Sequence, residues 1–545
     1  MDNEEIIDLL VDEYDLPNID LSTASTKALN FQKLNEYYTK GYIHFEKNGG
    51  EKCYAINNIL LLKDSAIDPL DDKPIYLIRN NDLLQILERD FALQNTHNAI
   101  SHLEEIPPNV SAKSIDYFKA ISGFGIIFFS TFFLFFQAFN VLNALCFMML
   151  NLLKFMLFQR VLVNEEESSP LKLIDQKLPI YSILIPLYKE ELKVSSILQS
   201  MENINYPKNK MDVKLIIESD DTLTSQALAA IDLPSYVHII RVPYSLPRTK
   251  PKALNYAMAY VKGEFLTIYD AEDEPDPDQL LKAIYAFDNL PENFVCIQAK
   301  LNFYNAKDNL LTRFFSIEYS IWFEYLLKGL SLLDWPVTLG GTSNHFKVDK
   351  LKEVGCWDAY NVTEDADLGI RLYLKGYKVH LINSTTIEES PSNINVWIAQ
   401  RSRWIKGFIQ TLYVFIKTPK NLQKFSLSKI CVVYIFVGLS TYSLFILPWV
   451  LLSVTMNTDI LITYLWIVAT ISSFAYMYSS AALALTKNNT TLITLSPMDW
   501  VTLICWPLYF ILHTIASYRA IYEILISPFT WNKTPHGKFS DDLDE

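Results

Sequence analysis

Four long runs without a charged residue constrain this chain more than any other feature of its sequence. They cover residues 120–153, 430–458, 460–486 and 500–518. One membrane crossing needs about 20 consecutive apolar residues. The first run, extended through residues 154–163, therefore predicts two crossings, which we expect to be joined near residues 140–143. A single long buried helix is the alternative, but residues 128–136 are too apolar on every face for a half-exposed helix.

The rest of the chain has the composition of a soluble protein. Charged residues make up 20% of the 545 residues and about 25% outside the four runs, which is the usual soluble value. The net charge of −14 argues against a nucleic-acid binder, whose surface is basic. Six cysteines without C-x-x-C spacing argue against a zinc site or a disulfide framework. The acidic start, Met-Asp-Asn-Glu-Glu, is unlike a secretory signal peptide.

Lysines near the ends of the apolar runs predict the topology, because cytoplasmic loops carry an excess of Lys and Arg. Four of them precede the run at 430–458: Lys417, Lys420, Lys424 and Lys429. Residues 456–459 contain neither Lys nor Arg and are expected outside. We therefore predict a multi-pass protein of the inner cell membrane with its central domain in the cytoplasm.

The last apolar run does not fit this topology simply. If residues 500–518 cross the membrane, Lys533 and Lys538 of the tail lie outside, against the rule. A re-entrant or interfacial segment would avoid the conflict. The sequence leaves these alternatives open.

The order of apolar and polar segments predicts six regions. They are an N-terminal cytoplasmic α/β module (1–115), two transmembrane helices (118–163), a central α/β domain (164–392), an amphipathic interface helix (393–416), two to three transmembrane helices (430–525) and a polar tail (526–545). In the N-terminal module we expect strands at 42–45, 52–59 and 74–78, and helices at 81–90 and 91–103. No catalytic cluster is visible there.

The central region alternates apolar strands with helical patterns, as in a parallel α/β sheet. The strands are expected at 179–186, 213–218, 237–242 and 264–270. Carboxylates follow three of them: Glu190, Asp220 with Asp221, and the group Asp270, Glu272 and Asp273. The carboxyl ends of such strands form the ligand-binding edge. Clustered carboxylates repel one another unless a positive charge lies between them. The pattern therefore predicts a divalent cation that carries substrate phosphates.

Two further groups of residues stand out. Thr363, Glu364 and Asp365 precede a helical segment at 366–374. Gln400, Arg403 and Trp404 lie in an amphipathic helix whose basic and aromatic face suits a membrane surface. A plain interfacial helix would not require these last three residues together.

The ordered set Asp220-Asp221, Asp270-x-Glu272-Asp273, Thr363-Glu364-Asp365 and Gln400-x-x-Arg403-Trp404 resembles the D, D-x-D, T-E-D, Q-x-x-R-W series of family-2 glycosyltransferases of the cellulose synthase-like group. The resemblance covers residues 178–410 and extends to segments at 251–255, 340–346 and 528–537. It implies a GT-A (Rossmann-like) catalytic domain with transmembrane helices on both sides and a small N-terminal α/β domain. One position departs from the pattern, because the second acid of D-x-D is Glu272, followed by Asp273. Which of the two contacts the metal stays open.

The resemblance also implies a role for each matching residue in inverting transfer of a hexose from a nucleoside-diphosphate sugar, expected to be a UDP-sugar. Asp365 would be the general base, and Asp270 with Glu272 or Asp273 would bind Mg²⁺ or Mn²⁺. Thr363 and Glu364 complete the acceptor-side motif. The nucleotide-sugar contacts would come from Tyr188, Glu190, Asp220, Asp221, Lys252, Gln400, Arg403 and Trp404. The partners implied are the donor, the bilayer and a glycan or lipid acceptor.

Some alternatives remain open at this stage. Processive synthesis competes with single transfer, and four to five crossings are few for an export channel. A surface-assembly or phage-receptor scaffold with a weak enzyme domain, or a transporter, would also have several crossings. The N-terminal region is similar to the domain that begins type II secretion ATPases, as in relatives of the phage N4 adsorption glycosyltransferase. That similarity raises cyclic dinucleotide binding as a further expectation, although the Arg-Leu-Gly pattern of binding versions is absent.

Overall fold

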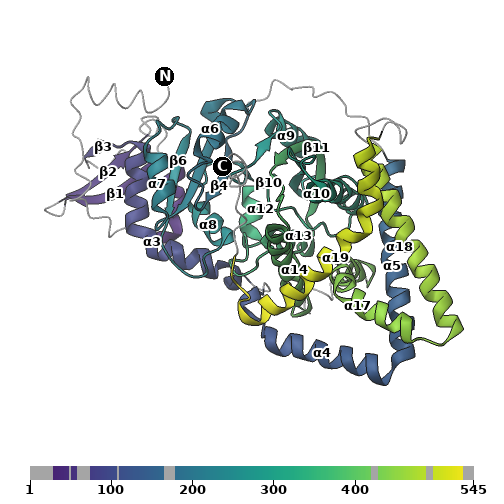
Figure 1. The fold of residues 1–545 in the computed structure, drawn as a ribbon. Helices are drawn as coiled ribbons and strands as arrows, with labels where there is room; N and C mark the ends of the chain where they lie inside the picture. The colour runs from purple at the N-terminus through teal and green to yellow at the C-terminus, as the bar shows by residue number, and fades with distance from the viewer. Residues whose placement is uncertain are drawn as a thin grey trace, which may run out of the picture.

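The computed structural model describes residues 29–47, 51–57, 74–106, 110–164, 178–418, 427–486 and 495–531. Lys420, Lys424, Lys533 and Lys538, on which part of the topology argument rests, lie outside these residues. The chain has three parts in space (Figure 1). A small sheet lies at one end, the central α/β domain follows, and long helices form the opposite end. The predicted fold class is confirmed.

An eight-stranded mixed sheet forms the centre of the molecule. Its order is β6-β5-β4-β7-β10-β9-β11-β8. Strands β4, β5, β6 and β7 pair in parallel, and β10 is antiparallel to both neighbours. The strands are β4 (Tyr181–Leu187), β5 (Met211–Glu218), β6 (Val237–Val242), β7 (Phe265–Ile268), β8 (Glu274–Pro275), β9 (Phe294–Phe303), β10 (Asn344–Lys347) and β11 (Lys378–Glu388).

The four parallel strands lie where the apolar runs predict them. Strand β5 is buried along its whole length, which is expected of a parallel strand covered on both faces. Helices cover the sheet and place the loops after β4, β5 and β7 at one edge. The helices of this domain are α6 (Val194–Asn203), α7 (Thr222–Ala229), α8 (Lys250–Ala257), α9 (Gln279–Asn289), α10 (Leu310–Ser320), the π-helix η6 (Ile321–Leu327), α11 (Lys328–Leu332), α12 (Val348–Glu353), α13 (Glu364–Leu374) and α14 (Ile394–Ile416).

The N-terminal module is a three-stranded sheet flanked by helices. It contains α2 (Leu34–Lys40), β1 (Tyr42–Lys47), β2 (Glu51–Ile56), β3 (Ile75–Leu77) and α3 (Asn80–Glu105). Helix α3 is continuous where two helices were expected. It packs on α8, and the buried Asn95 side chain donates to the Tyr256 carbonyl at 3.0 Å. The module is thereby fixed to the helix that begins at Lys250.

Two pairs of consecutive helices form the membrane part, and the helices of each pair diverge from the turn that joins them (Figure 1). The first is α4 (Tyr117–Leu134) and α5 (Phe136–Val163). The second is a continuous run of α16 (Leu427–Val433), the π-helix η7 (Tyr434–Leu439) and α17 (Ser440–Met456), followed by α18 (Ile460–Thr486). These four segments are long and apolar enough to cross a membrane, as is α19 (Pro497–Ile526). Side chains near the turns within the two helix pairs, including Phe132 and Trp466, pack into one apolar cluster.

The expected turn at residues 140–143 is wrong. The chain turns between α4 and α5 at Phe135, and both Asn140 and Asn143 lie inside α5. The Trp466 indole donates to Asn140 Oδ1 at 2.9 Å, and the Tyr442 hydroxyl donates to Asn143 Oδ1 at 2.8 Å. These polar residues therefore join membrane helices instead of turning the chain.

Helix α19 contacts the central domain along its length. Near its start, Asp499 pairs with Arg313 of α10 at 3.0 Å. In its middle, the Tyr509 hydroxyl donates to Glu318 at 2.6 Å. Just past its end, the Ser527 and Thr530 carbonyls accept from Lys406 of α14 at 3.4 and 3.1 Å. Figure 1 shows α19 running across the junction between the central domain and the other long helices. Both of its ends therefore lie on the side of the central domain.

Candidate active site

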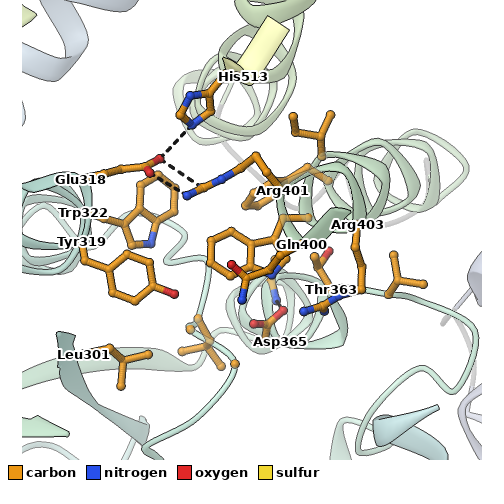
Figure 2. Close-up of a pocket in the computed structure, with 18 of the residues that line it drawn as sticks. Leu301, Glu318, Tyr319, Trp322, Thr363, Asp365, Gln400, Arg401, Arg403 and His513 are labelled. Carbon is orange, nitrogen blue, oxygen red and sulfur yellow. Dashed lines mark hydrogen bonds and ion pairs between the residues drawn. The ribbon is translucent and has the colours of Figure 1, made fainter. Parts of the chain in front are cut away.

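One cavity of about 620 Å³ lies between the sheet edge, α13, α14 and the membrane helices. Figure 2 shows Thr363, Asp365, Gln400 and Arg403 gathered in it, with Glu318, Arg401 and His513 beside them. Ten of the residues predicted from the sequence line this cavity: Tyr188, Glu190, Asp270, Glu272, Thr363, Glu364, Asp365, Gln400, Arg403 and Trp404.

Asp365 lies in the first turn of α13, where its Oδ1 accepts from the Ala366 amide at 2.7 Å. Burial raises the pKa of its carboxyl to about 6, although that amide, Lys250 and Arg403 act in the opposite direction. The start of α13 approaches α14 closely because position 407 is glycine. A Cβ atom there would lie 2.3 Å from Thr363 Oγ1. Asp365 and Arg403 therefore face the same cavity.

Glu364 and Lys250 set the charge around Asp365. Burial, followed by repulsion from Asp365, raises the pKa of Glu364 to about 8. Burial opposes the charge of Lys250, but Asp270 and Glu364 outweigh it and raise the pKa of this ammonium group. Its Nζ contacts Asp270 and donates to the Gly341 carbonyl at 2.8 Å. The pKa values of these two adjacent acids therefore differ, and Asp365 is the one that ionises at the lower pH.

The acidic cluster after β7 divides into two kinds of position. Asp270 and Glu272 line the cavity. Asp273 is buried behind them, where the Asp270 amide donates to its Oδ2 at 2.7 Å and Thr342 also contacts it. Burial and then Asp270 and Glu272 raise its pKa. Of the two acids left open by the sequence, Glu272 is the one beside the cavity.

A divalent cation fits this cluster. Glu388 at the end of β11 lines the same cavity, and burial followed by repulsion from Asp273, Glu272 and Asp270 raises its pKa. Glu388 Oε1 and Asp273 Oδ1 are buried without a hydrogen-bond partner among the described residues. Across the described ranges, no three side chains form a ready-made metal cage. Mg²⁺ in proteins is usually held by one or two carboxylates together with substrate phosphates.

The residues of the Q-x-x-R-W helix take different positions. The Arg403 guanidinium lies over the Trp531 ring, with Cζ 4.5 Å from the ring centroid, and Trp531 also lines the cavity. Gln400 Oε1 and Arg403 Nε are buried without a partner in the described part of the chain. Trp404 packs against Phe315 with ring centroids 5.9 Å apart. Arg403 and Gln400 therefore present unused polar groups to a ligand, whereas Trp404 supports the wall.

Three residues expected to contact the nucleotide lie outside the cavity lining. Asp221 is buried, where it accepts from the Lys189 amide at 2.5 Å and caps α7 through Thr224. Asp220 pairs with Arg248, which itself lines the cavity. Lys252 is fully buried and contacts Glu218 at 2.9 Å. The lysine that reaches the cavity from this helix is Lys250.

Four residues of the site were not assigned from the sequence: Arg248, Lys250, Glu388 and Trp531. Lys250 and Glu388 could have been predicted, because Lys250 begins a helix and Glu388 ends a strand at the same edge of the sheet. Trp531 lies in the tail segment that resembles the family. Nothing in the sequence around Arg248 distinguishes it from an arginine on the protein surface.

Comparison with known proteins agrees with this geometry. The model of the family described as "Glycosyl transferase family group 2" matches residues 265–515, which include the carboxylate cluster, Asp365 and the Arg403 helix. Residues 265–515, just under half of the chain, are thus similar to glycosyl transferase family group 2. The sequence-based recognition is therefore confirmed. No comparison bears on the secretion ATPase likeness of the N-terminal module, which stays a prediction.

Curated glycosyltransferases are similar to part of the chain. A probable glycosyltransferase, YdaM of Bacillus subtilis, is 28% identical over 274 residues, or 50% of this chain and 64% of that protein. A beta-monoglucosyldiacylglycerol synthase of Nostoc is 26% identical over 244 residues, or 44% of this chain and 51% of that one. This chain thus spans about half to just under two thirds of their lengths. The mannosyltransferase PcManGT of Pyrobaculum calidifontis, solved with GDP-Man and Mn²⁺, has a TM-score of 0.45 at 16% identity and covers 70% of this chain and 97% of its own.

Replacing Lys252 by methionine is expected to damage folding. Glu218 would remain as an unpaired buried charge, which costs about 3–5 kcal/mol. Thermal unfolding of the purified protein measures the loss. Lys250→Met is the matched control, because its partner Asp270 is partly exposed. We expect that variant to lose activity with a much smaller drop in melting temperature. An equally stable Lys252→Met protein with weakened nucleotide binding would restore the original assignment.

Proposed function

We propose that this protein transfers a sugar, with inversion, from a nucleoside-diphosphate sugar to a hydroxyl group of a lipid acceptor. The observation that carries the proposal is the cavity itself. It joins the carboxylate cluster, Asp365 and Arg403 at the sheet edge to membrane-helix side chains such as Phe147 and Leu447. A donor and a membrane-held acceptor would meet at Asp365.

The proposed reaction is one displacement at the anomeric carbon. Asp365 takes the proton of the acceptor hydroxyl as its oxygen forms the new bond, and the nucleoside diphosphate leaves with the electron pair of the broken bond. No enzyme nucleophile takes part, so the configuration inverts. Arg403, Lys250 and Arg248 line the cavity as cations that balance the charge of the diphosphate. The planar guanidinium group of an arginine matches phosphate oxygens well.

A cation held by Asp270 and Glu272 would supply further positive charge to the leaving diphosphate. The chain's own contribution is to hold these carboxylates in fixed positions. Asp273 orders the loop through its bond from the Asp270 amide, and Lys250 holds the Asp270 side chain. Tyr188 and Glu190 follow β4 and line the cavity, and we propose that they contact the base and ribose of a uridine nucleotide.

A lipid acceptor is favoured over a growing polysaccharide. The cavity continues between helices with apolar side chains, and a relative is named as a beta-monoglucosyldiacylglycerol synthase. Because both ends of α19 contact the central domain, we further propose that this helix lies along the membrane surface. Four crossings then remain among the described residues, and Lys533 and Lys538 would be on the cytoplasmic side, as the positive-inside rule requires. Single transfer follows, since four helices are few for an export channel.

The direct test uses the purified full-length protein in phosphatidylcholine vesicles that contain diacylglycerol or phosphatidylglycerol as a hydroxyl-bearing acceptor, with a panel of radiolabelled UDP- and GDP-sugars. We expect one donor to label the lipid fraction with a single sugar per lipid, in the configuration opposite to that of the donor. A water-soluble polymer as the product would overturn the single-transfer proposal. Nucleotide binding without transfer or hydrolysis for any donor would favour the scaffold alternative.

Replacing Glu388 by glutamine is expected to have opposite effects with and without metal. In the absence of metal it relieves repulsion with Asp273, Glu272 and Asp270, so the melting temperature should rise. With metal, loss of one negative charge should weaken Mn²⁺ binding roughly ten-fold, about 1.4 kcal/mol. Mn²⁺ titration and thermal unfolding of the same samples measure both. A lower melting temperature in the absence of metal contradicts the repulsion described for the cluster.

A further inference from the structure

Lys154 of α5 is a cation inside the membrane half of the cavity. It follows directly on the charge-free run at 120–153, and its side chain lines the same cavity as Asp365. Its ammonium group lies over the Tyr476 ring, 5.1 Å from the centroid. Within the part of the chain that the structure describes, it has no hydrogen bond and no ion pair. An ionisable residue in such a place marks a binding site by default.

The acid whose charge acts on Lys154, Glu318, is already paired with other groups. Glu318 also lines the cavity and acts on this lysine through its charge. Its two oxygens, however, accept from Arg401 at 3.1 and 2.6 Å and from His513 at 3.3 Å (Figure 2). They also accept from the Tyr509 hydroxyl at 2.6 Å. Arg401 already balances the charge of Glu318. Lys154 therefore adds one uncompensated positive charge to this part of the cavity.

The position of Lys154 along α5 matches the depth of a lipid phosphate. The helix begins at Phe136, just after the turn at Phe135, and ends at Val163 beside the central domain. About 20 residues cross the hydrocarbon core, so the core ends near residue 155. A crossing counted from Phe136 would put Lys154 close to the level of lipid phosphate groups.

The surroundings of Lys154 suit a phosphate with an attached chain. Ser473 lines the cavity next to Asn151, which donates to its hydroxyl at 2.8 Å. On the membrane side, Leu150, Leu447 and Met477 line the cavity with apolar groups. A polar and cationic end continuous with an apolar one is the complement of an anionic lipid.

We infer that Lys154 binds the phosphate of an anionic lipid in this cavity. Calling that lipid the acceptor rests on the proposed function and requires a lipid with a free hydroxyl group, such as phosphatidylglycerol, whereas its binding does not. A phosphodiester such as phosphatidylglycerol and a lipid monophosphate such as a polyprenyl phosphate share this chemistry. Diacylglycerol, which lacks a phosphate, would not use Lys154.

The test compares three full-length variants with the wild type in phosphatidylcholine nanodiscs. The nanodiscs contain phosphatidylglycerol, polyprenyl phosphate or diacylglycerol, and lipid retained by the protein is counted by native mass spectrometry. Lys154→Gln should weaken retention of the phosphate-bearing lipids about ten-fold or more, and Lys154→Arg should restore it. Arg160→Gln is the matched control, because Arg160 lies exposed on the same helix. Soluble glycerol phosphate should not compete, which separates a lipid from free phosphate.

Two results would overturn the inference. One is equal retention by wild type and Lys154→Gln when both have the same melting temperature. The other is equal loss in Arg160→Gln, which indicates general attraction to an anionic surface. Transfer of label is measured in parallel. Charge-dependent retention without transfer to any lipid would contradict the proposed function and leave this binding site supported.

Discussion

Replacing Asp365 by asparagine is expected to lower sugar transfer by about 10³-fold, within the range that a positioned general base contributes. The substitution keeps the shape of the side chain and its bond from the Ala366 amide, but it removes the proton acceptor. Arg403 and the carboxylates after β7 are untouched, so nucleotide binding in the presence of Mn²⁺ should change less than two-fold. Transfer and equilibrium nucleotide binding are measured on the same preparation.

The pH dependence of sugar transfer is a second test of the role of Asp365. Because burial raises the pKa of Asp365 to about 6, wild-type transfer should fall as the pH drops through about 6 rather than through about 4. The residual activity of Asp365→Asn should lack this limb. Asp349→Asn, at an exposed acid of α12, is the control and should keep both rate and profile. Full turnover by Asp365→Asn would remove Asp365 from the role of base.

The sequence was sufficient to predict the parallel half of the sheet and the edge that carries the site. Apolar strands followed directly by acids fix both the strand ends and the side on which Asp270 and Glu272 lie. The direction of a side chain at a helix start was not predictable in this way. Lys250 and Lys252 are two residues apart on one helix and point to different places, one to Asp270 and the other to Glu218. Only the packing of α8 decides between them.

The membrane part shows a similar limit. Asparagines in an apolar run predict a turn, because polar side chains are costly in lipid. In the structure Asn140 and Asn143 are satisfied by Trp466 and Tyr442, which are about 300 residues away in sequence. The real turn at Phe135 has no polar or small residue to mark it. Similarly, the composition of α19 predicts that it could cross the membrane. Only its contacts with Arg313 and Lys406 favour a position along the membrane surface.

Replacing Asp270 by asparagine is expected to abolish metal-dependent nucleotide binding. Asp270 lines the cavity beside Glu272, and hard divalent cations require charged oxygen ligands. We expect the affinity for UDP in Mn²⁺ to fall about 100-fold and transfer to fall at least as far. Removal of Mn²⁺ from the wild type with a chelator should have the same effect. Asp288→Asn, at an exposed position on α9, should bind as the wild type does.

A competing explanation is that Asp270 acts only by holding Lys250. The variant Lys250→Gln separates the two roles, because it removes that ion pair while it keeps both carboxylates. If Asp270 binds the metal, Lys250→Gln should retain the Mn²⁺ dependence of UDP binding and lose only part of its affinity. If Asp270 only positions Lys250, the two variants should show the same metal-independent loss. Titration of both variants with UDP, with and without Mn²⁺, therefore assigns Asp270 either to the cation or to the lysine.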